Sequence, residues 1–165
     1  MSKLTKSQEE LADLLLNTKI KAKVRRRKLT PSGYEFYHVI RDTSPIDFRT
    51  DSSEFAFVHH EKNPDAPLSP IIVNLRNLPQ KLITKIATVL NEVKLKQTPD
   101  FCTGIPNAAI PFAREFSKIS KIPYVTIFEK DDNPGKPRIL PAKNAPLGEN
   151  KTLLIVDDVI TKGAS

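Results

Sequence analysis

Residues 152–165, which read TLLIVDDVITKGAS, constrain the fold more than any other part of the sequence. They open with the apolar run Leu153–Val156. Such a short run, rich in β-branched residues, is typical of a strand buried on both faces of a parallel sheet. Two carboxylates, Asp157 and Asp158, follow directly. We therefore expect them at the carboxyl end of the strand, where open α/β sheets bind their ligands.

A loop of small and hydroxyl-bearing residues completes this stretch, and it can wrap a phosphate. Backbone amides and hydroxyls bind the phosphate oxygens, provided that a helix begins behind the loop. The carboxylates can accept hydrogen bonds from ribose hydroxyls, so the combination predicts a sugar-phosphate site. Because the loop needs such a helix, we expect the domain to continue beyond Ser165. The loop consists of Val159, Ile160, Thr161, Lys162, Gly163, Ala164 and Ser165.

Two other interpretations fit the same stretch. One is a buried strand that ends in a solvated acidic turn. The other is the first strand of a response-regulator receiver domain, which also reads IVDD. The Thr-x-Gly-x-Ser order at Thr161, Gly163 and Ser165 favours the phosphate site.

Length, cysteine content and hydropathy bound the class of protein. A chain of 165 residues fits one domain with a sizeable core. Cys102 is the only cysteine, so no internal disulfide can form and a reducing compartment is natural. No apolar run approaches the roughly 20 residues of a membrane span, and the N-terminus lacks a signal pattern. We expect a cytoplasmic protein with no membrane association.

The net charge of +7 is concentrated near the N-terminus. Residues 1–30 contain nine Lys and Arg residues against three acidic residues. This arm could contact nucleic acid or another polyanion, or it could be a solvated basic edge or a patch that attracts an anionic substrate. No aromatic residue interleaves the basic run, so the sequence favours the solvated edge over nucleic acid.

Hydrophobic periodicity predicts helices alternating with strands, hence a parallel sheet flanked by helices. Helices are expected over 7–17, with Ser7 as N-cap and Glu10 completing a capping box, and over 78–96 and 109–121. Two antiparallel strands, 34–40 and 54–60, are expected outside this sheet as a small hood. Strands of the sheet are expected over 71–76, 100–105, 123–128 and 153–156, with a long loop over 130–151.

The chain is expected to divide into two parts. Residues 1–68 would hold the N-terminal helix, the basic arm and the hood strands, and residues 69–165 the α/β core. His38, His59 and His60 have no partner at metal-ligand spacing, so we expect strand-surface histidines and no metal site built by the protein.

A second anion site is predicted where the strand over 100–105 turns into the following helix. Amides of such a turn can hold an anion, although the glycine could equally serve turn geometry alone. Two such turns in one sheet favour a ligand with phosphates at both ends. The turn residues are Gly104, Ile105, Pro106, Asn107 and Ala108.

Residues 152–165 resemble the phosphoribosyl pyrophosphate (PRPP) motif of type I phosphoribosyltransferases: four apolar residues, two acids, two apolar residues and Thr-x-Gly-x-Ser. Residues 69–79, SPIIVNLRNLP, resemble the SPIYxxLR segment of orotate phosphoribosyltransferases. Residues 99–113, PDFCTGIPNAAIPFA, are similar to the pyrophosphate turn of the same enzymes. The resemblance covers roughly residues 69–165 and implies a phosphoribosyltransferase-like fold.

The resemblance implies transfer of ribose 5-phosphate from PRPP to orotate, with Mg²⁺, giving orotidine 5′-phosphate and pyrophosphate in pyrimidine biosynthesis. Asp157 and Asp158 would hold the ribose hydroxyls, and residues 159–165 would wrap the 5′-phosphate. Thr161 would also lie near orotate, and residues 104–108 would face pyrophosphate. The resemblance also implies a homodimer.

This sequence departs from that family in two places. Ile72 stands where many members have an aromatic residue against the base. In the loop whose cations meet pyrophosphate, this chain has Phe128, Glu129, Asp132 and Pro134, and a shift of one residue recovers only Lys130. Lys136 and Arg138 lie near in sequence and could substitute. A PRPP-sensing or nucleic-acid-binding regulator on the same fold, or a transferase for another base, therefore stays an alternative.

Overall fold

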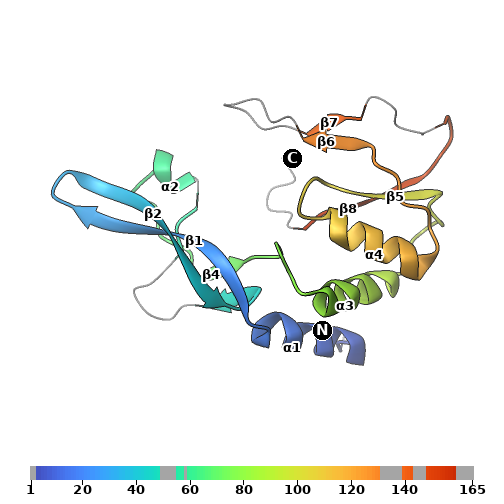
Figure 1. Ribbon diagram of the computed structural model, residues 1–165, viewed down its shortest axis with the longest axis horizontal. Coiled ribbons are helices and arrows are strands. Elements are labelled where there is room, and N and C mark those ends of the chain that lie inside the picture. Colours follow the sequence, from blue (N-terminus) through green and yellow to red (C-terminus); the bar gives the residue numbers. More distant parts are fainter. Residues whose placement is uncertain (1–2, 49–54, 58, 131–138, 143–147, 159–165) are drawn as a thin grey trace. The chain divides into compact units, whose positions relative to one another are not determined.

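The chain forms two compact units in a computed structural model that describes residues 3–48, 55–57, 59–130, 139–142 and 148–158 (Figure 1). One unit comprises Ala12–Leu75, and the other comprises Met1–Leu11 with Arg76–Ser165. These units are defined by contacts, and the division of the chain at residue 69 stays a prediction.

A parallel sheet forms in the unit that contains the C-terminal part of the chain. Strand β5 (Phe101–Gly104) pairs in parallel with β8 (Leu153–Val156). On the other edge of β5, Tyr124 forms a parallel bridge with Cys102. The parallel arrangement predicted from the alternation of strands and helices is confirmed for these segments. Leu153–Val156 is not buried on both faces, however, because Ile155 is 50% exposed.

Helices cover one face of this strand pair. Helix α4 (Ile110–Ser120) packs on β5 and β8, and α3 (Gln80–Asn91) packs on α4 (Figure 1). The core joins all three layers through Ala87, Cys102 and Phe116. Around it pack Ile119, Ile122, Tyr124 and Leu154.

Both predicted helices in this unit are confirmed, but α3 ends before residue 96. The Glu92 amide donates to the Val89 carbonyl and the Val93 amide donates to the Leu90 carbonyl, each at 3.2 Å. These i→i−3 bonds tighten the last turn and end the helix. Val93, which follows the last turn, is consequently 55% exposed, although it lies within the helix expected over 78–96.

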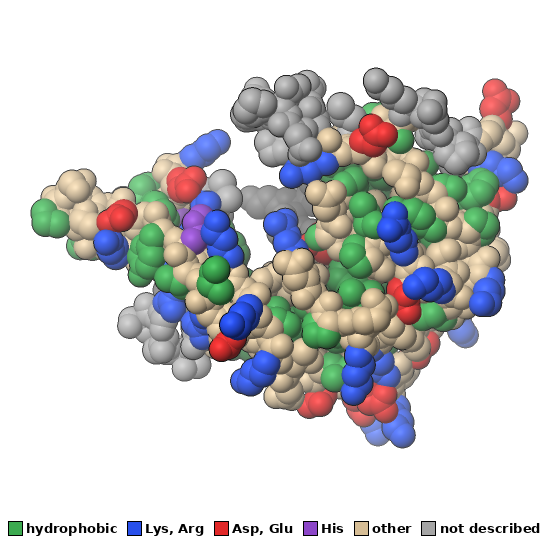
Figure 2. Space-filling model, in the orientation of Figure 1, with side chains coloured by type: hydrophobic (Ala, Val, Ile, Leu, Met, Phe, Trp, Pro, Cys, Tyr) green, Lys and Arg blue, Asp and Glu red, His purple; other side chains and the backbone are tan. Residues whose placement is uncertain are grey.

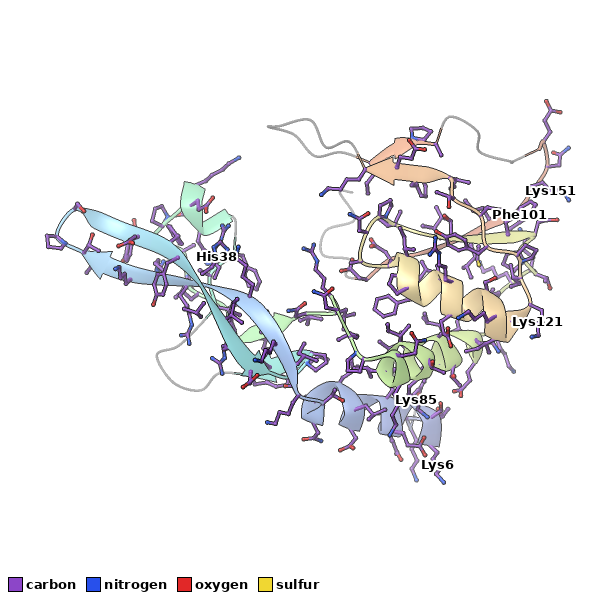
Figure 3. All side chains as sticks on the ribbon, in the orientation of Figure 1. Lys6, His38, Lys85, Phe101, Lys121 and Lys151 are labelled. Atoms are coloured by element: carbon purple, nitrogen blue, oxygen red, sulfur yellow. The ribbon has the colours of Figure 1, made fainter. Side chains whose placement is uncertain are left out.

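Helix α1 (Lys6–Asn17) confirms the predicted N-terminal helix, with a different cap. Thr5 Oγ1 accepts a hydrogen bond from the Gln8 amide at 3.2 Å, and Gln8 Oε1 accepts one from the Thr5 amide at 2.9 Å. This reciprocal pair is a capping box, so Thr5 replaces Ser7 as the N-cap. An ion pair between Glu10 and Lys85 joins the start of α1 to α3; Lys85 is labelled in Figure 3.

The basic run is a strand rather than an arm. Strand β1 (Ile20–Thr30) pairs antiparallel with β2 (Gly33–Thr43) in a long hairpin. Ile20, Ala22 and Val24 are buried and alternate with exposed lysines, so the run has a period of two and one apolar face. Gly33 adopts a φ of 115° in the turn, a conformation that glycine accommodates without strain.

A second, shorter pair completes the hood. Strand β3 (Ile46–Phe48) pairs antiparallel with β4 (Ile71–Val73). The strand expected over 71–76 in the parallel sheet is therefore shorter and belongs to an antiparallel pair. No strand was expected between residues 40 and 54, yet this segment supplies β3. Ile46 lies opposite Val73, and the two apolar side chains share one face of the pair.

The strand expected over 54–60 is wrong. Phe55 forms one bridge, with Ser69, and helix α2 (His59–Lys62) follows. His60 Nδ1 accepts from the Phe57 amide at 2.9 Å, and its Nε2 lies 3.0 Å from the Pro67 carbonyl oxygen. These local bonds compete with strand pairing. His60 is 1% exposed, so it is a buried histidine and not a strand-surface one.

The segment after α4 also differs from the prediction. The strand expected over 123–128 is reduced to the bridge at Tyr124, and β6 (Phe128–Lys130) pairs antiparallel with β7 (Ile139–Pro141). Part of the loop expected over 130–151 is therefore a strand. Among the described residues, no helix has the length and apolar character needed to cross a bilayer.

Asp100 fixes the register of β5 and β8 at their N-terminal ends. Its Oδ2 accepts from the Thr152 amide at 2.8 Å and its Oδ1 lies 2.9 Å from Lys151 Nζ. Phe101 and Lys151 lie together at this end of the strand pair (Figure 3). The Thr152 hydrogen bond and the Lys151 ammonium hold the pKa of the Asp100 carboxyl below its usual value.

We predict that Asp100→Ala lowers the thermal midpoint at pH 7 and that this difference shrinks in acid. A carboxyl whose pKa is lowered on folding stabilises the fold above its ordinary pKa of about 3.9, and loses this effect as the pH falls through the lowered value. Thermal melts of both proteins between pH 7 and pH 3 measure it. Asp65→Ala, which removes an exposed carboxylate, is the control. An equal loss for Asp100→Ala at every pH would contradict the prediction.

Candidate functional site

The pairing of β5 with β8 brings the two predicted anion-binding segments to one edge of the sheet. Gly104 lies opposite Val156 in the last register pair, and the Ile105 amide donates to the Val156 carbonyl at 2.9 Å. Residues that follow these positions therefore leave the sheet side by side. The turn after β5 and the acidic pair after β8 therefore start from the same edge, and together they make up the candidate site.

The acidic pair begins immediately after β8. Asp157 and Asp158 are both half-buried, and the Asp158 amide donates to Asp157 Oδ1 at 2.8 Å. This bond holds the backbone in a tight bend at the strand end. Within the described part of the chain, no other hydrogen bond or ion pair engages either carboxylate. Both carboxylates can thus accept hydrogen bonds from a ligand.

The turn after β5 is shaped by the close approach of Gly104 to α4. A Cβ at residue 104 would lie 2.7 Å from the Ala109 carbonyl oxygen and 2.8 Å from the Ile110 Cα. The Ala109 amide donates back to the Ile105 carbonyl at 3.2 Å, and the Pro106–Asn107 peptide bond is cis. Packing against α4 therefore requires glycine at residue 104. This agrees with the interpretation that the glycine serves the geometry of the turn.

The same turn also exposes amides that can bind an anion. Asn107 is exposed and Ala108 is half-buried, and no backbone bond among the described residues uses their amides. Ala109 is the N-cap of α4 and makes no side-chain capping bond. The start of α4 thus presents uncapped amides and the positive end of the helix dipole beside the acidic pair.

The remaining predicted site residues are either on β6 or outside the described residues. Val159, Ile160, Thr161, Lys162, Gly163, Ala164 and Ser165 are outside the described residues. Lys130 is exposed on β6 opposite Ile139, and Glu129, also exposed, lies opposite Leu140. Asp132, Pro134, Lys136 and Arg138 are outside the described residues.

Comparison with known proteins identifies the family of the domain. The family model for the phosphoribosyl transferase domain matches residues 72–165, which is more than half of the chain. The chain belongs to the phosphoribosyltransferase family. No curated protein and no solved structure matched the chain. Membership implies PRPP-dependent transfer in general, and both segments of the site lie within the matched range.

Thr103 directly precedes Gly104 on β5, and the sequence assigned no role to it. It is 1% exposed, and its hydroxyl has no hydrogen-bond partner among the described residues. Burying a hydroxyl without a hydrogen-bond partner costs about 1–3 kcal/mol of folding free energy. The Thr103 hydroxyl, beside the turn, is therefore available to form a hydrogen bond. No sequence signal distinguishes it, because its burial depends on the face of β5 to which it belongs.

The acidic pair of this phosphoribosyltransferase fits the Mg²⁺ that such enzymes generally use with PRPP. No group of three or more possible ligands gathers within the described ranges. Mg²⁺ is commonly held by one or two carboxylates together with substrate phosphates and water, rather than by a dedicated protein cage. Asp157 and Asp158 supply oxygen ligands of that kind, and the ion would shield the charge of the pyrophosphate group.

We predict that Gly104→Ala impairs both folding and pyrophosphate binding. The added methyl group meets backbone atoms at 2.7–2.8 Å, so the start of α4 must shift away from the turn. We expect a lower thermal midpoint and at least about a tenfold weaker affinity for Mg·pyrophosphate, measured by calorimetry.

Gly148→Ala is the matched control, because nothing lies within 4 Å of a Cβ at residue 148. Its stability and affinity should equal those of the unmodified protein. Equal behaviour of the two variants would show that the close approach at Gly104 is unimportant.

Proposed function

We propose that this protein transfers ribose 5-phosphate from PRPP to orotate, giving orotidine 5′-phosphate and pyrophosphate. The observation that carries the proposal is the Ile105–Val156 hydrogen bond, which sets the turn beside the acidic pair. PRPP has a pyrophosphate group on the ribose carbon that reacts. A site for it therefore needs sugar-hydroxyl acceptors next to an anion-binding turn, and this edge of the sheet has both.

The chemistry requires positioning and charge stabilisation rather than a protein nucleophile. The bond between the ribose and pyrophosphate breaks as the base nitrogen approaches, and positive charge develops on the ribose ring. Asp157 and Asp158 would hold the ribose hydroxyls and stabilise this charge electrostatically. Amides at residues 107–108 and the start of α4 would stabilise the negative charge that grows on the departing pyrophosphate.

Orotate as the base is supported by two segments of the sequence. Residues 69–79 and 99–113 resemble the corresponding segments of orotate phosphoribosyltransferases. Ile72 is half-buried on β4, opposite Asp47 of β3. Many members of the family have an aromatic residue at this position, so a panel of bases is part of the test.

The experiment is pyrophosphate release from Mg·PRPP with orotate, uracil, adenine, guanine or hypoxanthine as the acceptor. We expect release with orotate, at a low rate because Glu129 stands where the family has a cation. The loss of orotate absorbance provides an independent readout. Release with a different base would reject orotate and keep the transferase. Tight PRPP binding without release for any base would instead favour a PRPP-sensing regulator.

We predict that Asp158→Asn weakens Mg·PRPP binding at least about tenfold while the fold survives. A hydrogen bond to a charged group contributes about 1.5–3 kcal/mol, and Asp158 makes no ion pair within the described residues that the change would break. Calorimetry measures the affinity, and circular dichroism checks the fold. Asp65→Asn removes the same charge at an exposed position and should bind PRPP normally. Unchanged affinity of Asp158→Asn would remove the sugar-binding role.

A further inference from the structure

The β1–β2 hairpin carries most of the excess positive charge of the chain. Residues 20–43 include seven Lys and Arg residues and two acidic residues, which gives +5 of the overall +7. Lys and Arg side chains are interspersed with hydrophobic side chains over these strands (Figure 2). The phosphoribosyl transferase match begins at residue 72, so it leaves this hairpin without a role.

Strand pairing places aromatic rings among the basic side chains. Arg26 lies opposite Tyr37, and Arg27 lies opposite Phe36. Directly opposite residues of an antiparallel pair share a face. The basic run contains no aromatic residue, and on this ground the sequence favoured a solvated basic edge over a nucleic-acid contact. In the hairpin, β2 places aromatic side chains next to the basic ones.

One tyrosine ring on each face of the hairpin contacts a cation, because Tyr34 lies opposite Leu29 and Tyr37 lies opposite Arg26. The Arg27 guanidinium lies 4.5 Å from the centre of the Tyr34 ring, and Lys28 Nζ lies 5.7 Å from the centre of the Tyr37 ring. Both rings are 38% exposed. Partly exposed rings beside cations are the elements with which proteins hold single-stranded nucleic acid, because bases stack on the rings and cations meet the phosphates.

The basic residues divide into those held by the hood and those available to a ligand. Arg27 donates to the carbonyls of Pro64 and Ala66, and Arg25 pairs with Glu61 at 2.7 Å. These two arginines, which share a face, are structural. Arg26 and Lys28 share the opposite face of β1 with Tyr37 of β2.

On that opposite face, neither cation is committed to a strong partner. Arg26 Nε is buried and has no hydrogen-bond acceptor among the described residues. Lys28 pairs with Glu35 at 2.9 Å, but both side chains are more than half exposed, so the pair contributes little and can exchange for a phosphate. A ligand with phosphate oxygens would pair with Lys28 and with the terminal nitrogens of the Arg26 guanidinium, because the Nε atom itself is buried.

We propose that the hairpin face formed by Arg26, Lys28 and Tyr37 binds single-stranded nucleic acid. One base stacks on the Tyr37 ring, and phosphates on either side of it meet Arg26 and Lys28. A duplex keeps its bases stacked on each other and would lose the contact with the ring. A free anion such as PRPP would use the charges and leave the tyrosine without a role.

The test is fluorescence anisotropy of a labelled 15-nucleotide oligouridylate over a series of salt concentrations. Tyr37→Ala should weaken binding at least about fivefold, whereas Tyr37→Phe, which keeps the ring, should bind like the unmodified protein. Arg26→Ala with Lys28→Ala should lower the slope of log affinity against log salt by about 1.4, because each lost phosphate contact removes about 0.7. The charge-preserving pair Arg26→Lys with Lys28→Arg should keep the slope.

The matched control is Lys96→Ala with Lys118→Ala, which removes two exposed charges outside the hairpin; Lys118 pairs with Glu115 at 2.9 Å, as Lys28 does with Glu35. It should leave the slope nearly unchanged. An equal loss in the control, equal binding of a duplex or of polyglutamate, or unchanged binding by Tyr37→Ala would each overturn the proposal. A change confined to the KM for PRPP in the Arg26 and Lys28 variant would show instead that the face attracts substrate.

Discussion

The parallel pairing of β5 with β8 is the interaction on which the site depends. Asp100 holds one end of this pair through the Thr152 amide, and the Ile105–Val156 bond holds the other. Between these ends, Cys102 and Leu154 pack towards α4, so the pair is fixed by hydrogen bonds along its edge and by apolar packing on its face. A slip by one residue would turn the packed side chains to the opposite face and separate the turn from the acidic pair.

The site combines two local geometries that each leave polar groups unused. After β8, the Asp157–Asp158 bend fixes the backbone and leaves carboxylate oxygens available. After β5, the contact of Gly104 with the start of α4 keeps the turn close to the helix axis, where its amides add to the helix dipole. Acceptors and donors thus meet at one edge, as a ligand with both hydroxyls and phosphates requires. Family membership rests on the sequence match, and the arrangement of this edge rests on strand pairing. The two observations are independent, and both are consistent with binding of PRPP.

The hood uses its charge in another way. Alternation along the first half of β1 buries Ile20, Ala22 and Val24 and exposes Lys21 and Lys23. Towards the turn, the face of the buried residues continues with Arg26 and Lys28. Some of the basic side chains bind the neighbouring segment, as Arg27 does through the carbonyls of Pro64 and Ala66. Others are exposed at the surface. The same strand therefore contributes to the hood core and presents a charged aromatic face.

Elements with local signals could be predicted from the amino-acid sequence. The apolar run at 153–156, the helical spacing over α3 and α4, and the glycine turn at 104 each follow from neighbouring residues, and each lies where it was expected. The pairing of the strands, in contrast, follows from the tertiary fold. It gave β1 to β2 and β3 to β4, turned the strand expected at 54–60 into a bridge and a short helix, and exposed Ile155. Strand pairing depends on partners that are distant in the chain. A pattern of period two predicts which face of a strand is apolar, but it does not predict which other strand pairs with it.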